Sequence, residues 1–241
     1  MQFLSDMWQW FTDGDHWTGD EGIPHLLWQH IQISFIAVVV AIVIALPIGL
    51  VFGHYRRGGF VAINLANIGR ALPALALLIL AVREFGSGDP PDWLQAIGVG
   101  SLPTFLALVA LAIPPVVTNT YVGVSSVDAA TREAAQGMGM SGGQVLRRIE
   151  VPLAMPLIMA GIRTTAVAVV ATATLAAIVG WGGLGRYIID GFRVGDDQRL
   201  FAGALLVALL AIVVELALAV VERLVVSRGL RFREHNGTPT T

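Results

Sequence analysis

The chain has 241 residues, of which 55% are hydrophobic and 13% are charged, and its formal net charge is −2. A soluble domain of this size carries more charged surface, so the composition indicates a lipid bilayer as the solvent. The chain contains neither cysteine nor lysine, which excludes disulfides, thiolate chemistry and a lysine-containing phosphate loop for hydrolysing ATP within this chain.

Residues 1–28 are predicted to lie at the outer surface of the membrane. Five acidic residues, and no lysine or arginine, precede the first long apolar run, so this segment does not resemble a cleavable signal peptide. The segment is rich in tryptophan, whose ring favours the headgroup layer because it is apolar while its N–H stays hydrated. These residues are Trp8, Trp10, Trp17 and Trp28.

Five segments follow that approach the roughly 20 apolar residues of a membrane-spanning helix. They comprise residues 33–52, 60–82, 101–124, 153–180 and 201–226. Arginines gather in the first loop, in the third loop and in the tail over residues 227–241, and this asymmetry indicates that those regions are cytoplasmic. The sequence therefore predicts an all-α integral membrane protein with its N-terminus outside and its C-terminus in the cytoplasm.

Residues 125–152 form the longest predicted cytoplasmic loop. Ser125 and Asp128 can each cap the start of a helix, residues 129–136 are good helix formers, and Gly137 with Gly139 ends that helix. Small side chains dominate the helix, so a groove of another protein can approach its backbone closely. The loop is therefore expected to dock to a soluble partner.

A second short helix is predicted after these glycines. Ser141 and Gln144 have the spacing of a capping box, in which each residue satisfies a backbone N–H near the other. Pro152 lacks an N–H and is expected to begin the next element. The loop as a whole is expected to be a compact helix–glycine–helix unit that projects from the membrane domain.

The loop resembles the signature of binding-protein-dependent ABC importer permeases, which is Glu-Ala-Ala, three residues, Gly, nine residues, then Ile-x-Leu-Pro. The matching residues are Glu133, Ala134, Ala135, Gly139, Ile149 and Pro152, and Val151 stands in the leucine position. The resemblance implies a type I ABC importer transmembrane domain over residues 29–226. It also implies that the loop is the coupling helix, which sits in a groove of a separate ATP-binding subunit.

The same resemblance implies the partners and the location of the protein. It implies a transport subunit of the bacterial cytoplasmic membrane rather than an enzyme, with no cofactor of its own and with ATP and Mg used by the partner. Because five spans cannot enclose a pathway alone, we expect a second permease copy or paralogue, two ATP-binding subunits and an external substrate-binding protein. No nucleic acid partner is expected. No metal site is expected either, since the five histidines are scattered near ends and loops.

The runs around Asn119, Gly161 and Gly182 are similar to osmoprotectant permeases, which carry glycine betaine, choline and carnitine. An ABC permease for an amino acid such as methionine is the alternative, because methionine-type permeases share some of these features. A secondary transporter or channel is the alternative from another class. Such a protein would need no coupling loop and usually shows more spans or internal symmetry.

Residues in or near the predicted spans are candidates for a translocation path. They are Arg70, Pro73, Asn119, Thr120, Tyr121, Arg163 and Glu215. Charges inside a membrane are usually functional or paired, so Glu215 either attracts a quaternary ammonium ion or pairs with an arginine. For Asn119 and Thr120 the alternative is helix–helix packing by small and polar residues.

A glycine-rich stretch after the fourth predicted span is the candidate outer gate. It contains Trp181, Gly182, Gly183 and Gly185. So many glycines disfavour a helix and favour a tight loop. A simple turn with an interfacial tryptophan is the alternative interpretation.

Overall fold

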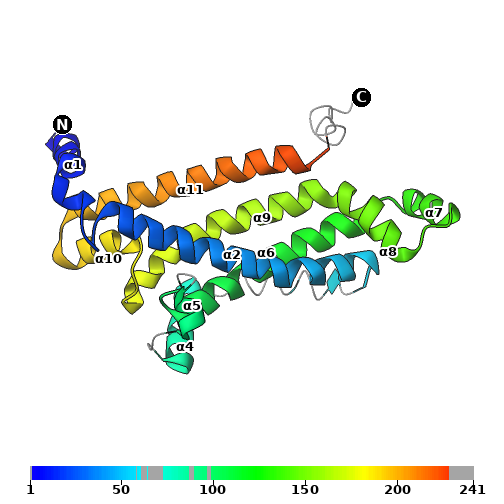
Figure 1. The fold of residues 1–241 in the computed structure, drawn as a ribbon, viewed down its shortest axis with the longest axis horizontal. Coiled ribbons are helices and arrows are strands. Elements are labelled where there is room, and N and C mark those ends of the chain that lie inside the picture. Colours follow the sequence, from blue (N-terminus) through cyan, green and yellow to red (C-terminus); the bar gives the residue numbers. More distant parts are fainter. Residues whose placement is uncertain are drawn as a thin grey trace. The chain divides into compact units, whose positions relative to one another are not determined.

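A computed structural model of the chain describes residues 2–57, 59–60, 64, 73–86, 90–96 and 99–227, with the side chains of residues 2–4 left undescribed. All regular secondary structure in these ranges is helical (Figure 1). The chain divides into two compact units. The first unit comprises residues 1–41, 70–112 and 166–214, and the second comprises residues 42–69, 113–165 and 215–241.

This division follows the predicted alternation of the loops. The predicted outer regions, at the N-terminus and around the gate glycines, fall in the first unit, whereas the predicted coupling loop falls in the second. Four long helices of the described residues contribute to both units: α2 (Ile23–His54), α6 (Leu102–Ser125), α9 (Val151–Ala173) and α11 (Asp197–Val225).

The first long helix, α2 (Ile23–His54), begins ten residues before the predicted span 33–52. Residues 23–32 contain no lysine, arginine, aspartate or glutamate, and Pro24 occupies the first helical turn, where a missing N–H has no helical partner to lose. Trp28, at the end of the segment predicted to lie at the membrane surface, is thus part of α2. The helix also continues through Pro47.

The predicted span 60–82 lies largely outside the described residues, and so does its candidate Arg70. The end of this span is helical in α4 (Ala74–Phe85), which starts after Pro73 as its N-cap. A short helix, α5 (Asp92–Ala96), follows.

Two other long helices lie close to predicted spans. The helix α6 (Leu102–Ser125) overlaps the predicted span 101–124 and continues through Pro114 and Pro115. The helix α11 (Asp197–Val225) starts four residues before the predicted span 201–226.

The coupling loop contains α7 (Ala129–Gly137) and the short helix α8 (Gly142–Val145). The helix α8 continues directly into a π-helical turn, η2 (Leu146–Glu150), and then into α9 (Val151–Ala173) and a 3₁₀ turn, η3 (Thr174–Val179). Pro152, expected to begin the next element, lies in the first turn of α9, within one continuous helical run.

The π-helical turn gives a physical reason for this continuity. The N–H of Val151 donates to the carbonyl of Leu146, five residues back, so the turn is wider than in an α-helix. A proline lacks its own N–H and crowds the carbonyl four residues earlier. The widened turn directly before Pro152 provides space for its ring without ending the helix.

The core of the first unit joins the N-terminal segment to the region after the gate glycines. The segment consists of α1 (Gln2–Thr12) and a 3₁₀ turn, η1 (Gly14–Trp17), and the later region is α10 (Gly185–Val194). The ring of Trp10 packs edge-to-face on Tyr187, with centroids 5.5 Å apart. The Tyr187 hydroxyl donates to the carbonyl of Glu21 over 2.6 Å, so α10 is fixed to the chain just before α2.

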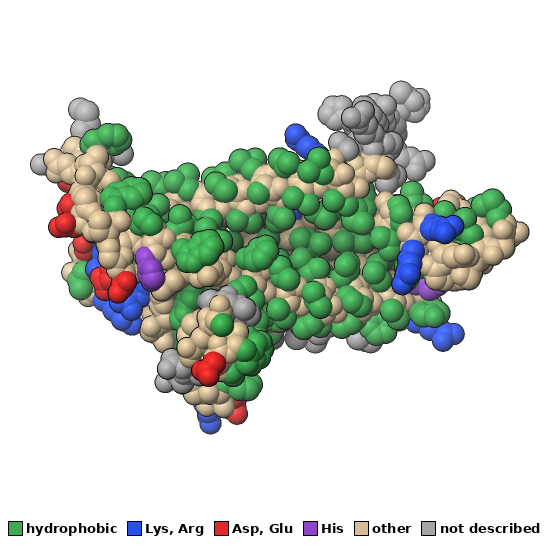
Figure 2. All heavy atoms as spheres, viewed as in Figure 1, with side chains coloured by type: hydrophobic (Ala, Val, Ile, Leu, Met, Phe, Trp, Pro, Cys, Tyr) green, Lys and Arg blue, Asp and Glu red, His purple; other side chains and the backbone are tan. Residues whose placement is uncertain are grey.

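The described residues contain four helical runs that are long and apolar enough to cross a membrane. They are Ile23–His54, Leu102–Ser125, Gly142–Val179 and Asp197–Val225. Figure 2 shows hydrophobic side chains along the long helices, whereas charged side chains gather around α1, α10 and the α4–α5 region in the first unit and around α7 and α8 in the second. Such apolar surfaces are those expected of helices that contact lipid.

Candidate functional site

The helix α7 has a defined start and a defined end. The side chain of Asp128 accepts a hydrogen bond from the N–H of Thr131 over 3.2 Å and so caps the first turn. The N–H of Met138 donates to the carbonyl of Ala134 over 3.1 Å at the last turn. Gly139 follows with φ of +85°, a left-handed conformation that glycine adopts without steric cost.

The exposure of α7 agrees with a docking element. Glu133, Ala134 and Gly139 are exposed, whereas Ala135 is buried against the rest of the second unit. Of the remaining residues predicted for coupling, Ile149 is half-buried in the π-helical turn and Pro152 is exposed at the start of α9. The structure therefore presents Glu133 and Ala134 of the motif on the surface of the second unit, whereas Ala135 packs inward.

A fully buried carboxylate lies beneath this helix. The Oε1 atom of Glu150 lies 2.7 Å from Nε of Arg132 in α7, and its Oε2 atom lies 2.6 Å from Nδ1 of His54 at the end of α2. An ionised carboxylate only accepts hydrogen bonds, so opposite an ionised Glu150 the imidazole of His54 would donate from Nδ1. The three side chains thus join α2, α7 and the π-helical turn.

Two further bonds bring the end of α2 to the same region. Arg132 donates from Nη2 to the carbonyl of His54 over 2.7 Å, and Arg56 donates from Nη2 to the carbonyl of Val127 over 2.7 Å. The sequence did not lead us to this cluster. Its only local signal is Glu150, a charged residue between the motif residues Ile149 and Pro152.

The polar residues of α6 take part in close helix contacts. The side-chain amide of Asn119 donates to the carbonyl of Pro115 over 2.8 Å. A Cβ atom on Gly161 of α9 would lie only 2.5 Å from Asn119 Cβ, and one on Gly49 of α2 would lie 2.6 Å from Thr120 Cβ. Asn119 and Thr120 therefore lie at close helix–helix contacts, as the packing alternative expected. Tyr121, the next candidate, is half-buried.

Arg163 lies between two carboxylates of α11. Its Nε atom is 2.9 Å from Oε1 of Glu215, and its Nη1 atom is 2.7 Å from Oε2 of Glu222. Glu215 thus has the arginine partner that the second sequence interpretation expected. One guanidinium faces two carboxylates, so with all three groups ionised this cluster carries one surplus negative charge.

The candidate gate glycines form the predicted tight loop between η3 and α10. The N–H of Gly183 donates to Oε1 of Gln29 in α2 over 3.0 Å, and the N–H of Trp181 donates to the carbonyl of Ala176 over 3.1 Å. A Cβ atom on Gly185 would lie 2.1 Å from the carbonyl oxygen of Thr174, so only glycine fits there. The loop is thus held by α2 and by the end of the α9–η3 run.

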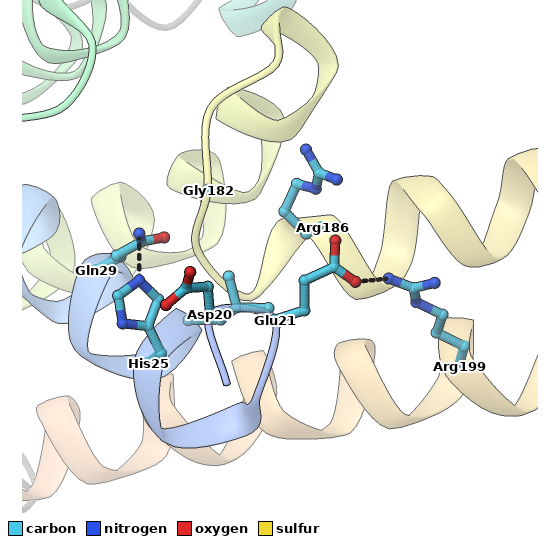
Figure 3. A pocket seen from close by; sticks show the side chains of 8 residues that line it. Asp20, Glu21, His25, Gln29, Gly182, Arg186 and Arg199 are labelled. Atoms are coloured by element: carbon cyan, nitrogen blue, oxygen red, sulfur yellow. Dashed lines mark hydrogen bonds and ion pairs between the residues drawn. The ribbon is translucent and has the colours of Figure 1, made fainter. Parts of the chain in front are cut away.

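A pocket of about 480 Å³ opens beside this loop in the first unit. Figure 3 shows His25 hydrogen-bonded to Gln29 and Glu21 directed toward Arg199, with Gly182 on the loop above them in this view. The lining side chains carry both charge signs: Asp20, Glu21, His25, Leu26, Gln29, Gly182, Arg186 and Arg199. The pocket therefore combines charged side chains of both signs with apolar surface such as that of Leu26.

No group of three or more metal-ligating side chains is found within the described ranges. His30, for example, is fully buried in α2, and its Nε2 atom lies 2.9 Å from the carbonyl of Val170. His30 therefore contacts the backbone of α9 and does not belong to a group of metal-ligating side chains.

Comparison with known sequences gives a family match over most of the chain. Residues 38–227 match the family described as "binding-protein-dependent transport system inner membrane component". The chain is 37% identical over 203 residues to the glycine betaine/carnitine/choline transport system permease protein OpuCB of Bacillus subtilis, covering 84% of this chain and 88% of that protein. It is 36% identical over 204 residues to the choline transport system permease protein OpuBB of the same organism, covering 85% and 88%.

A third relative comes from another organism. The osmoprotectant import permease protein OsmW of Salmonella typhimurium is 33% identical over 209 residues, covering 87% of this chain and 94% of that protein. Among solved structures, a chain of the inward-facing MetNI methionine ABC transporter has a TM-score of 0.69 at 20% identity, covering 83% of this chain and 94% of that chain. An amino acid ABC transporter chain has a TM-score of 0.63 at 21% identity, covering 92% and 97%.

Proposed function

Because the chain belongs to the family of binding-protein-dependent transport system inner membrane components, we propose that it is the permease subunit of an ATP-driven importer for quaternary ammonium osmoprotectants. It is a multi-pass protein of the bacterial inner membrane. The observation that carries the substrate class is the identity of 33–37% to permeases named for glycine betaine, carnitine, choline and osmoprotectants. The methionine alternative has weaker support, because the methionine transporter is only 20% identical and so shares the fold alone.

In this proposal α7 is the element that receives the movement of an ATP-binding subunit. Its exposed residues Glu133 and Ala134 would enter a groove of that subunit, and the small side chain of Ala134 would permit a close approach. Two such subunits, a second permease copy or paralogue and an external binding protein would complete the transporter. ATP and Mg would then be used by the partner subunits.

The proposed orientation is that of the positive-inside prediction, with the loop of residues 125–152 on the cytoplasmic side. The loop at Trp181–Gly185 and the mixed-charge pocket beside it would then face outward, where a binding protein delivers substrate. Asn119, Tyr121 and the cluster of Arg163 with Glu215 and Glu222 are our candidates for the inner part of the path. The surplus negative charge of that cluster supports a cationic substrate group.

Uptake by the reconstituted complex tests the proposed substrate. Proteoliposomes with the binding protein and ATP should take up labelled glycine betaine, choline or carnitine, and unlabelled methionine should not compete. Uptake of methionine in place of these amines would reverse the substrate assignment. Uptake that continues without any ATP-binding subunit would overturn the assignment as an ATP-driven permease.

Substitution of Glu133 tests the role of α7 most directly. Glu133→Arg changes an exposed side chain, so the chain should still insert in the membrane while uptake is no longer coupled to ATP hydrolysis. Gly139→Asp should have the same effect, but its positive φ adds backbone strain, which makes it the less specific variant. Unchanged uptake in Glu133→Arg would count against coupling through α7.

A further inference from the structure

The least expected group in the second unit is the buried carboxylate of Glu150. An ionised carboxylate is costly to remove from water unless it is paired and hydrogen-bonded. Here Oε2 lies within hydrogen-bond distance of Nδ1 of His54 at 2.6 Å, and Oε1 lies 2.7 Å from Nε of Arg132 in an ion pair without hydrogen-bond geometry. Because a buried ion pair contributes little net stability compared with apolar packing, its presence calls for a role beyond stability.

The three groups lie at the junction of separate elements. His54 is the last residue of α2, Arg132 is in the second turn of the nine-residue helix α7, and Glu150 ends the π-helical turn that leads into α9. Arg132 also donates to the carbonyl of His54, so it contacts both of the other residues. A single displaced side chain would therefore loosen α7 from two helices together.

Chain connectivity explains why such a link is needed for α2. The helix α7 is joined through short segments to α6 before it and to α8 and α9 after it. His54, in contrast, is 78 residues before Arg132, so α2 follows α7 only through non-covalent contacts. Arg132 directly precedes the exposed Glu133, so one turn of α7 carries both the surface side chain and the buried contact.

We propose that the His54–Glu150–Arg132 cluster is a rigid link that makes the end of α2 and the start of α9 move together with α7. The link rests on the proposed function of α7 as the coupling helix and adds to it the residues that distribute its movement. Arg56, which donates to the carbonyl of Val127 next to the α7 cap, reinforces the same junction. The three residues are positioning residues that do not contact substrate.

Distance measurements test the rigid link in the assembled transporter. The natural chain has no cysteine, so two introduced cysteines can carry spin labels without a background signal. Tyr55 beside His54 and Met138 at the end of α7 are suitable sites, because they are 66% and 73% exposed. In a labelled complex that still transports, their distance should be the same with and without trapped ATP. A distance that changes with nucleotide would overturn the proposal.

Neutralising the cluster should make the distance between the two labels depend on nucleotide. Glu150→Gln with Arg132→Gln removes both charges and leaves no unpaired buried ion, which favours folding. In this double variant the label distance should broaden or change with ATP. Arg57→Gln is the control, because Arg57 is an exposed arginine three residues after His54. It should keep the narrow distance of the native chain, and a distance as broad as in the double variant would overturn the proposal.

Transport per ATP hydrolysed separates a positioning role from a merely structural one. In the double variant the complex should assemble and hydrolyse ATP while uptake per ATP falls roughly tenfold, within the range of typical coupling energies. The link would be rejected if assembly, ATP hydrolysis and uptake all fell in proportion. It would also be rejected if uptake per ATP hydrolysed did not change. If the native chain itself fails to assemble with an ATP-binding subunit, the proposed function fails instead, so the two failures are distinguishable.

Discussion

Replacing Gly161 with alanine should force α9 and α6 apart. A Cβ atom at this position would lie 2.5 Å from Cβ and 2.9 Å from Cγ of Asn119. Carbon atoms in favourable contact are about 3.5–4.0 Å apart, so the added methyl group needs roughly 1 Å of separation. Because Cβ of Asn119 is fixed to its backbone, rotation of that side chain cannot provide the space.

The expected loss follows from the cost of overpacking, which is about 1–3 kcal/mol. A chain of this size loses roughly 2–4 °C of melting temperature per kcal/mol, so Gly161→Ala should melt roughly 2–12 °C below the native chain. The six tryptophans provide an intrinsic fluorescence signal for the purified protein in detergent. Gly143→Ala is the matched control, since a Cβ atom there meets nothing within 4 Å, and it should melt no lower than the native chain.

A second substitution locates the clash. Asn119→Gly removes the crowding Cβ atom, whereas Asn119→Ala keeps it. Each Asn119 variant is combined with Gly161→Ala, and the stability of the double variant is compared with the sum of the two single effects. Only Asn119→Gly should make the double variant more stable than this sum. Its own cost of about 1 kcal/mol, for a glycine inside a helix, is already contained in its single effect. Native-like melting of Gly161→Ala, or equal recovery by both Asn119 variants, would refute the close contact of α9 and α6.

Three further outcomes are expected. Glu215→Gln and Glu222→Gln each remove the surplus negative charge, so each should raise the glycine betaine concentration at half-maximal uptake by roughly fivefold, the effect of about 1 kcal/mol for one charge at 4 Å in water. Loss of complex assembly in both variants would identify a structural cluster instead. Asp128→Ala removes the α7 cap and should cost about 1 kcal/mol, seen as faster hydrogen exchange in the first turn of α7, and native exchange there would contradict the capping role. Burial raises the pKa of Tyr187 above its ordinary value of 10.0, so the folded state holds this proton more tightly than the unfolded state. That stability is fully present below pH 10.0 and is lost as the pH rises through the folded-state pKa, so the melting temperature should fall more steeply at high pH in the native chain than in Tyr187→Phe, and identical profiles would exclude the effect.

Features that depend on local sequence were predictable. The cap of α7 at Asp128 and its end at Gly137 follow from side-chain and backbone preferences over a few residues, and the structure has both. The tight loop at Gly180–Gly185 follows from the same kind of preference. The apolar lengths indicated membrane helices because hydropathy adds along the chain, although α2 starts ten residues earlier than its apolar core suggested.

The sequence alone therefore determined the membrane character, the helical class and the exposed motif of α7, since each is written in neighbouring residues. Only the tertiary structure revealed that Glu150 meets Arg132 and His54, that Arg163 lies between Glu215 and Glu222, and that α8 continues into α9. His54 and Glu150 are 96 residues apart, so their pairing depends on how α2 packs against α7 and α9. A buried charge selects its partner by proximity in space, and the spacing of residues along the chain does not encode that proximity.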